Sequence, residues 1–245
     1  MTKVVGIIPA RWGSTRFPGK PLHGIAGKPL IQHVWERCTE ACCFDQIIIA
    51  TDDMRVAEAG FGIGAEIALT SPGHRSGTDR IAEVASKLKK ASVIFNIQGD
   101  EPLIDPTLLR RLVREVKANK QIDIITAATS LSSDAALNEH NVKVVFDSEG
   151  DALYFSRSCI PFHRAADKVD VYKHLGIYGF RRKALLNFVK LPPSLLEKAE
   201  QLEQLRALEN GMKIRVIVSE SNSIGVDTLE DATEVERLIL SGRSG

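Results

Sequence analysis

Three cationic side chains fall within ten residues of one loop near the start of the chain. The stretch IIPARWGSTRFPGKPL begins as an apolar run and continues with Arg11, Arg16 and Lys20 among three prolines and two glycines. Such cations can neutralise phosphate charge, while Ser14, Thr15 and backbone N–H groups can donate hydrogen bonds to phosphate oxygens. The loop therefore predicts a site for the triphosphate of a nucleotide, with a solvated basic loop as the alternative.

The positive charge of the chain is concentrated around this loop. The net charge is +1 over 245 residues, which argues against a dedicated nucleic-acid-binding protein. The first acidic residue is Glu36, and five basic residues precede it: Lys3, Arg11, Arg16, Lys20 and Lys28. A local positive field of this kind suits a small anionic ligand.

The glycine spacing excludes two familiar phosphate-binding loops. A P-loop requires G-x4-G-K-[ST], but five residues separate Gly13 from Gly19, and Pro21 follows Lys20 where a hydroxyl should stand. The dinucleotide pattern G-x-G-x-x-G is also absent. The loop nevertheless follows the first predicted strand, which is where ligands bind in open α/β sheets.

Two carboxylates are candidates for a magnesium site. Asp100 follows an apolar run in NIQGDEPLI, and Asp227 lies in GVDTLED. Mg²⁺ prefers oxygen ligands and usually takes one or two carboxylates together with phosphate oxygens. Both residues also stand near helix starts, although Asp105 and Thr228 are better placed as the caps there. Spacing alone does not show that Asp100 and Asp227 meet.

The elements that must position these residues alternate along the first half of the chain. Short apolar runs separated by helical patterns indicate a mainly parallel, Rossmann-like sheet flanked by helices. The predicted strands are 4–8, 46–51, 64–69, 92–98 and 122–129, and the predicted helices are 29–41, 77–88 and 105–117.

The second half predicts a smaller antiparallel addition, because its strands have few helices between them. These strands are 142–147, 152–157, 173–181 and 213–219, and two further helices are expected at 194–210 and 228–240. No repeat or flexible linker divides the chain. We therefore expect one domain over residues 1–245.

The cysteines and the hydropathy pattern indicate the cellular compartment in which the protein is expected. Three of the four cysteines lie within six residues, with no second cluster to complete a zinc site, so free thiols in a reducing compartment are expected. The amino terminus lacks a signal-peptide pattern, and no run of 18 apolar residues occurs. A cytoplasmic protein without membrane insertion is predicted.

Nine blocks of the sequence resemble the CMP-Kdo synthetases, the cytidylyltransferases that activate 3-deoxy-D-manno-octulosonate (Kdo). They cover essentially the whole chain in order. The blocks are the opening loop, ATDD (50–53), SGTDRIAEV (76–84), NIQGDEPLI (96–104), VKVVFD (142–147), ALYFSRSCIPF (152–162), KHLGIYGFR (173–181), LEQLRALENG (202–211) and GVDTLED (225–231).

The resemblance implies a nucleotidyltransferase that moves CMP from CTP to the anomeric hydroxyl of Kdo and releases diphosphate, for lipopolysaccharide synthesis. It also implies Mg²⁺ as cofactor and a homodimer, with sugar binding and dimerisation in the antiparallel portion at roughly 142–217. A cytidylyltransferase for a related acidic sugar and an inactive nucleotide-binding relative remain as alternatives.

The site residues implied by the resemblance, together with the loop, form three groups. The catalytic group is Lys20, Arg11, Asp100 and Asp227, of which Asp100 and Asp227 hold the metal. The nucleotide-binding group is Pro9, Ala10, Arg11, Ser14, Thr15, Arg16, Lys20, Arg75, Ser76 and Gln98, and which of the last three read cytosine is left open. The sugar-binding group is Arg157, His174, Tyr178, Glu203 and Gln204.

Two places depart from the commonest pattern of that family. Trp12 and Gly13 stand in the opening loop, where they can alter its rigidity. The polar segment 163–171 is short and divergent, so the family pattern does not carry over to the sugar contacts of this segment.

Overall fold

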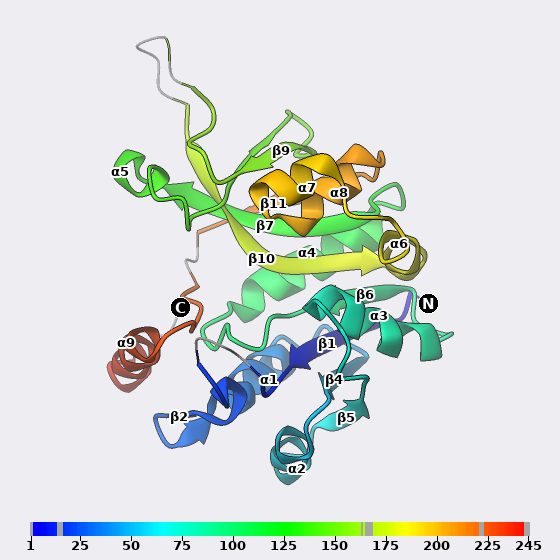
Figure 1. Ribbon diagram of the computed structural model, residues 1–245, viewed down its shortest axis with the longest axis vertical. Coiled ribbons are helices and arrows are strands. Elements are labelled where there is room, and N and C mark those ends of the chain that lie inside the picture. Colours follow the sequence, from blue (N-terminus) through cyan, green and yellow to red (C-terminus); the bar gives the residue numbers. More distant parts are fainter. Residues whose placement is uncertain (1, 14–16, 163, 165–168, 221–222, 243–245) are drawn as a thin grey trace.

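The fold is built on one large twisted sheet (Figure 1). The computed structural model describes residues 2–13, 17–162, 164, 169–220 and 223–242. The strand order is β11-β7-β10-β6-β1-β4-β5, and β8 and β9 extend the sheet beside β10. The strands are β1 (Val4–Ala10), β4 (Gln46–Thr51), β5 (Glu66–Leu69), β6 (Val93–Asn96), β7 (Ile124–Leu131), β8 (Lys143–Phe146), β9 (Ala152–Ser156), β10 (Val171–Arg181) and β11 (Ile214–Ser219).

Most of the sheet is parallel, as the alternating pattern predicts. β1 pairs in parallel with β4 and β6, β4 with β5, and β11 with β7. The exceptions are β8, β9 and β10. Strand β10 runs antiparallel to both β6 and β7 and so joins the two parallel sets, and β8 pairs antiparallel with β10 and with β9. The predicted α/β class is confirmed, and its antiparallel portion reaches the middle of the sheet.

Helices cover both faces of the sheet and divide the core in two (Figure 1). On one face α1 (Leu30–Glu40) and α4 (Pro106–Ala118) bury their apolar sides against Val4 and Ile8 of β1. On the other face α3 (Gly77–Lys87), α6 (Arg182–Phe188) and α8 (Glu203–Glu209) pack against Val5 and Ile7. The alternation of side chains along a strand produces this division.

Smaller elements complete the fold around the opening loop. A 3-10 turn, η1 (Lys20–Leu22), is followed by the hairpin of β2 (Gly24–Ile25) and β3 (Lys28–Pro29). Two short helices that the sequence pattern did not predict, α2 (Met54–Gly62) and α5 (Ser133–Ala136), follow β4 and β7, and α6, also not predicted, follows β10. The last helix is α9 (Leu229–Leu240).

The predicted single helix at 194–210 is wrong. The segment forms α7 (Leu195–Glu200) and α8, separated at Gln201, whose φ is 54°. The capping box of Ser194 and Glu197 starts α7 as expected, but α7 buries none of its side chains. Helix α8 buries four consecutive residues. The break allows the chain to bury α8 against the sheet while α7 stays at the surface, and this packing overrides the continuous helical propensity.

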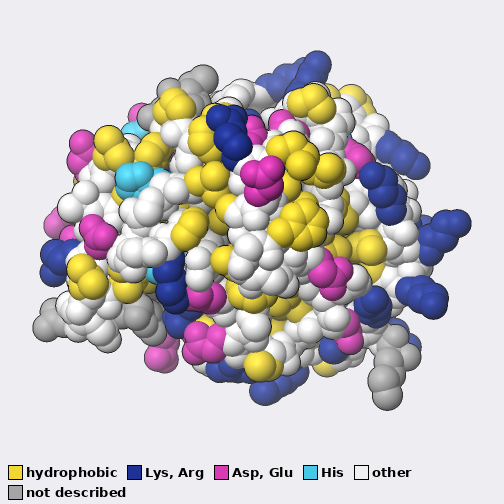
Figure 2. All heavy atoms as spheres, turned by 90° about the horizontal axis from the view of Figure 1, so that it is seen from below, with side chains coloured by type: hydrophobic (Ala, Val, Ile, Leu, Met, Phe, Trp, Pro, Cys, Tyr) yellow, Lys and Arg dark blue, Asp and Glu magenta, His cyan; other side chains and the backbone are white. Residues whose placement is uncertain are grey.

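Other helix starts follow the sequence closely. Asp105 caps α4 by accepting a hydrogen bond from the Thr107 N–H, with Pro106 at the first position. Thr228 and Asp231 form the second capping box, at the start of α9. Within the described parts of the chain, no helix has the length and apolar character needed to cross a membrane. The face formed by α2, α9 and the β2–β3 hairpin mixes apolar with charged side chains (Figure 2).

Candidate active site

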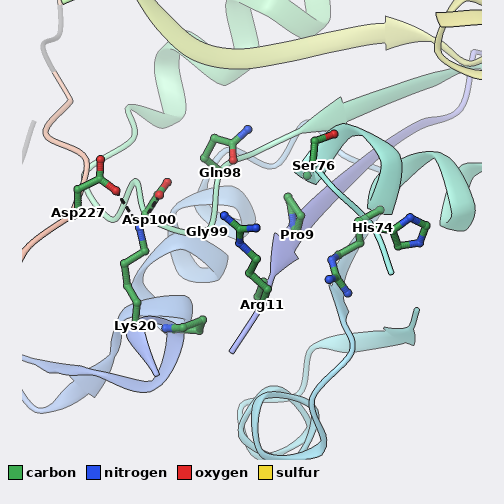
Figure 3. Close-up of a pocket in the computed structure, with 13 residues that line it drawn as sticks. Pro9, Arg11, Lys20, His74, Ser76, Gln98, Gly99, Asp100 and Asp227 are labelled. Carbon is green, nitrogen blue, oxygen red and sulfur yellow. Dashed lines mark hydrogen bonds and ion pairs between the residues drawn. The ribbon is translucent and has the colours of Figure 1, made fainter. Parts of the chain in front are cut away.

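A cavity of about 200 Å³ opens at the carboxyl ends of β1 and β6, and we call it the strand-end cavity (Figure 3). It lies beside the first turn of α3 and the η1 turn. Its lining consists of Pro9, Ala10, Arg11, Lys20, Pro21, His74, Ser76, Gly77, Arg80, Gln98, Gly99, Asp100 and Asp227. Residues from four separate parts of the sequence therefore share one site.

Three charged groups converge in this cavity. The Lys20 Nζ donates to Asp100 Oδ2 at 2.7 Å and lies 3.2 Å from Asp227 Oδ1 (Figure 3). It also donates to the Val226 carbonyl at 2.8 Å. The structure thus brings together the two carboxylates that sequence spacing left apart, with a cation between them.

Backbone contacts fix the position of the second carboxylate. The N–H of Val226 donates to the Asp100 carbonyl at 2.8 Å, so the segment before α9 is tied to the loop after β6. The Val226 side chain is fully buried in a cluster with Phe17 and Leu30. Asp227 itself donates its N–H to Asp231, which belongs to the capping box of α9.

The turn that carries Lys20 is anchored to Trp12. Gly19 has a φ of 72°, and a Cβ at this position would lie 3.0 Å from the Trp12 ring, so glycine is required. The Gly19 N–H donates to the Trp12 carbonyl at 3.2 Å. The Arg55 guanidinium stacks on the indole at 3.5 Å from its centroid, and Asp53 holds that guanidinium in a two-point ion pair.

The donor set at Asp100 and Asp227 fits Mg²⁺. The Lys20 ammonium group lies between the two carboxylates. Their combined negative charge favours a cation at this position. Among the described residues no group of three or more His, Cys, Asp or Glu could hold a metal ion. A hard cation bound by two carboxylates would complete its shell with phosphate oxygens and water, which is how Mg²⁺ is usually held.

The first turn of α3 forms another wall of the cavity. Ser76 caps the helix by accepting from the Asp79 N–H. A Cβ on Gly77 would lie 3.2 Å from Pro9 Cγ, and one on Gly99 would lie 2.9 Å from the Pro9 carbonyl oxygen. Both glycines therefore allow the backbone to close around the end of β1. The free N–H groups of a helix start favour an anion at this wall.

The sequence analysis did not predict two charged or titratable lining side chains, Arg80 and His74. Arg80 is buried and pairs with Asp52 at 3.2 Å and with the Thr70 hydroxyl. His74 pairs with Glu83 at 2.7 Å. Arg80 and Asp52 lie in two of the blocks that resemble the family, SGTDRIAEV and ATDD. Their presence in these blocks was the signal that could have marked them as site residues. The other unpredicted lining residues are Pro21, Gly77 and Gly99.

Not every predicted nucleotide residue lines this cavity. Pro9, Ala10, Arg11, Lys20, Ser76 and Gln98 do. Arg75 is absent from the described lining, although both of its neighbours belong to it. Ser14, Thr15 and Arg16 lie outside the described residues.

A second, smaller cavity of about 20 Å³ lies between β10 and α8, and we call it the β10–α8 pocket. Its lining is Thr78, Ile124, Tyr178, Phe180, Phe188, Glu203, Gln204 and Ala207. Three predicted sugar residues, Tyr178, Glu203 and Gln204, therefore meet here.

His174 adjoins this pocket through Tyr178. The two rings lie 5.2 Å apart, and the pairing of β10 with β7 shifts register between Leu175 and Tyr178. The His174 Nε2 lies 2.9 Å from the Thr126 hydroxyl. Burial lowers the pKa of His174 to about 3 and raises the pKa of Tyr178 well above its usual value, so both rings are neutral near pH 7.

Arg157 is held apart from both cavities. Its Nε donates to the Glu200 carbonyl at 2.8 Å, and its backbone N–H donates to the Glu200 carboxylate. The buried Lys143 donates to the carbonyl of Arg157. Arg157 thus belongs to a polar cluster at the end of β9, next to the break between α7 and α8.

Together, the parallel strand ends, the helix start and the cation between two carboxylates define a nucleotide-binding α/β protein of the nucleotidyltransferase class. The sequence model of the family described as "Cytidylyltransferase" matches residues 5–214. The chain belongs to this family.

Relatives and solved structures agree over nearly the full length. The protein named 3-deoxy-manno-octulosonate cytidylyltransferase from Geobacter sulfurreducens is 47% identical over 95% of this chain and 97% of its own length. The protein of the same name from Syntrophobacter fumaroxidans is 49% identical over 95% of each chain. A solved structure of CMP:2-keto-3-deoxy-manno-octonic acid synthetase complexed with CTP superposes with a TM-score of 0.95 at 42% identity, covering 98% of this chain and 100% of the other.

Proposed function

We propose that this protein is a magnesium-dependent 3-deoxy-manno-octulosonate cytidylyltransferase. It transfers CMP from CTP to the anomeric hydroxyl of Kdo and releases diphosphate, and the CMP-Kdo formed serves lipopolysaccharide synthesis. The observation that carries the proposal is Lys20 between Asp100 and Asp227 at the strand ends. Near-complete coverage by relatives of this name and the CTP complex of a 42% identical protein support the choice of substrates.

In this reaction the strand-end cavity receives CTP. Arg11 and Lys20 neutralise phosphate charge, and the N–H groups at the start of α3 donate to anionic oxygens. Lys20 must leave at least one of its carboxylate partners to reach a phosphate. Its Nζ is only partly buried, with 15% of the side chain exposed, so this exchange requires no opening of the core.

The chemical step is an in-line displacement at phosphorus. The anomeric oxygen of Kdo attacks the α-phosphorus of CTP, the bond to the bridging oxygen of the β-phosphate breaks, and diphosphate leaves. Mg²⁺ held by Asp100 and Asp227 would supply charge neutralisation at the phosphates and favour loss of the hydroxyl proton. The protein contributes position and fixed charge, and no residue forms a covalent bond to the substrate.

The sugar is proposed to bind on the β10 side. Tyr178, Glu203 and Gln204 offer one phenol, one carboxylate and one amide to its hydroxyls, with His174 supporting Tyr178. Arg157 offers a planar fork for the sugar carboxylate. Its guanidinium lies against backbone carbonyls, so sugar binding has to draw it toward the pocket.

The assay that tests the function is diphosphate release from CTP with Mg²⁺ and a panel of acidic sugars. Kdo should give the highest kcat/KM in the panel. Turnover with another acidic sugar but none with Kdo would identify the related cytidylyltransferase instead. No turnover with any sugar, together with retained CTP binding, would identify an inactive relative.

We further propose a cytoplasmic homodimer that associates through the 142–217 portion. Large apolar side chains in this portion are exposed, among them Phe162 at 87% and Leu195 at 81%. The four cysteines are free thiols, which suits a reducing compartment. Light scattering should give twice the mass of one chain, and a mass of 26.9 kDa would exclude the dimer.

A further inference from the structure

The first turn of α3 stands between the two cavities. Ser76 and Gly77 line the strand-end cavity, and Thr78 lines the β10–α8 pocket. The turn has little freedom, because Gly77 packs closely on Pro9 and the Thr78 side chain is buried. The same turn therefore closes the nucleotide side and reaches the other pocket.

Thr78 makes a direct hydrogen bond across this boundary. Its hydroxyl donates to Glu203 Oε2 at 2.8 Å, joining α3 to α8 over 125 positions of sequence. The other oxygen, Oε1, lies 3.8 Å from Arg206, whose guanidinium bonds Glu197 more closely at 2.9 Å. The short contact with Thr78 therefore orients the Glu203 carboxylate more strongly than the distant charge does.

The orientation of this carboxylate matters to the whole pocket. Glu203 is 40% exposed, so its side chain would be free to rotate toward solvent without a fixed partner. Its negative charge also adds to burial in raising the pKa of Tyr178, which places the two groups in one electrostatic environment. If the carboxylate that accepts a hydrogen bond from the substrate has to be ordered on binding, the cost of ordering it lowers the affinity for the substrate.

We propose that Thr78 is a positioning residue that holds Glu203 in the orientation in which it receives the sugar. The inference rests on the proposed function, since it takes Glu203 to contact the sugar. It adds to that function a threonine of the nucleotide-side helix that controls sugar recognition without touching the nucleotide. Ser76 and Gly77 line the strand-end cavity on one side of the turn, and Thr78 orients the Glu203 carboxylate on the other side.

The test compares Thr78→Val, Thr78→Ser and Glu203→Ala in the full chain, with CTP, Kdo and Mg²⁺. Thr78→Val removes the donor at nearly constant volume and should raise the KM for Kdo about tenfold, the effect of one hydrogen bond to a charged group. The KM for CTP should stay within about twofold, which also reports an intact fold. Thr78→Ser keeps the donor and should restore the KM for Kdo.

A double-mutant cycle separates orientation from packing. If Thr78 acts through Glu203, Thr78→Val should add little in the Glu203→Ala background, where the Thr78 hydroxyl has no carboxylate to orient. Additive effects, or equal rises in both KM values, would overturn the positioning role. Should the valine variant not fold, Thr78→Ala carries the same expectations.

The same measurements distinguish failure of the inference from failure of the proposed function. If Glu203→Ala leaves the KM for Kdo unchanged, the placement of the sugar is wrong and the inference falls with it. If Glu203→Ala raises that KM and Thr78→Val does not, the sugar placement stands and only the role of Thr78 is overturned.

Discussion

The strand-end cavity and the β10–α8 pocket differ in volume, in the charge of their lining and in the hydrogen bonds of their polar groups. The first is about 200 Å³, is lined by charged side chains and loop backbone, and contains an ammonium group that bonds three acceptors at once. The second is about 20 Å³ and is lined largely by aromatic and apolar side chains, and a hydrogen bond joins two of its polar residues, Thr78 and Glu203. The first is suited to ligands that exchange ionic partners, and the second to recognition by fixed geometry.

The difference follows from where each region stands in the fold. The strand-end cavity is formed by turns that follow β1 and β6, so short stretches of sequence determine its shape. The β10–α8 pocket depends on a strand inserted between β6 and β7 and on a helix that begins at a break. Substitutions in the first should mainly alter turnover or the KM for CTP, and substitutions in the second should mainly alter the KM for Kdo.

The largest effect is expected for Asp100→Asn. Removing one of the two negative charges weakens the proposed cation site at the point where charge develops, and turnover should fall about 10³-fold or more. The residue follows a strand end and is not part of the apolar core, so the melting temperature should change little. Initial rates of diphosphate release at saturating CTP measure the effect.

Asp105→Asn is the matched control for that variant. It makes the same chemical change five positions later, at the cap of α4, where asparagine also caps well. Its rate should stay near that of the unaltered protein. A near-normal rate for Asp100→Asn would exclude this residue from the proposed metal site, and the two regions would then not differ in their effect on turnover.

Arg157→Ala should have the next largest effect, and on the sugar side alone. Loss of a charged hydrogen-bonding group should raise the KM for Kdo about 10- to 100-fold and leave the KM for CTP unchanged. Arg182→Ala is the control, since the Arg182 guanidinium also bonds backbone carbonyls, those of Ala85 and Ser86. Equal rises in both KM values for Arg157→Ala would exclude it from the sugar pocket.

The strand-end cavity could be predicted largely from sequence because its determinants are local. The loop with Lys20, the run before Asp100 and the cap next to Asp227 each have a recognisable pattern. The meeting of Asp100 and Asp227 was not available from these patterns, since it depends on the backbone bond between Val226 and Asp100. Arg80 was missed for a similar reason, because its partner Asp52 lies on another strand end.

The β10–α8 pocket was predicted less completely because long-range packing decides it. The helical pattern of 194–210 is continuous in sequence, yet the chain breaks at Gln201 so that α8 can bury its apolar residues. Strand β10 was expected in an antiparallel addition, but it lies at the centre of the sheet. The contact of Thr78 with Glu203 joins elements that no local pattern connects.

The buried His174 should make folding stability depend on pH. Its pKa is about 3 in the folded protein and near 6.5 when unfolded, so the unfolded chain binds a proton first as the pH falls. The contribution of His174 is therefore complete above pH 6.5 and is lost progressively between pH 6.5 and 3. At pH 5.5 the loss should be about 1.4 kcal/mol.

Urea unfolding of the unaltered protein and of His174→Gln at pH 7.5 and 5.5 measures this term. Glutamine keeps a polar group near Thr126 and does not titrate. The unaltered protein should lose about 1.4 kcal/mol more than the variant over this interval. An equal loss of unfolding free energy in both proteins would show that burial does not lower the pKa of His174, contrary to a closed environment around this ring.

The smallest effect is expected at the edge of the strand-end cavity, for Arg55→Gln. This change removes the cation stacked on Trp12 and so loosens the turn that presents Lys20. Exposed stacks of this kind contribute about 0.5–1 kcal/mol, so the KM for CTP should rise about two- to fivefold, with the KM for Kdo unchanged. Arg237→Gln, which removes an exposed arginine from an ion pair with Glu234, should leave both unchanged. If Arg55→Gln raised the KM for Kdo instead, the turn at Trp12 would affect sugar binding as well. The strand-end cavity and the β10–α8 pocket would then not be independent sites.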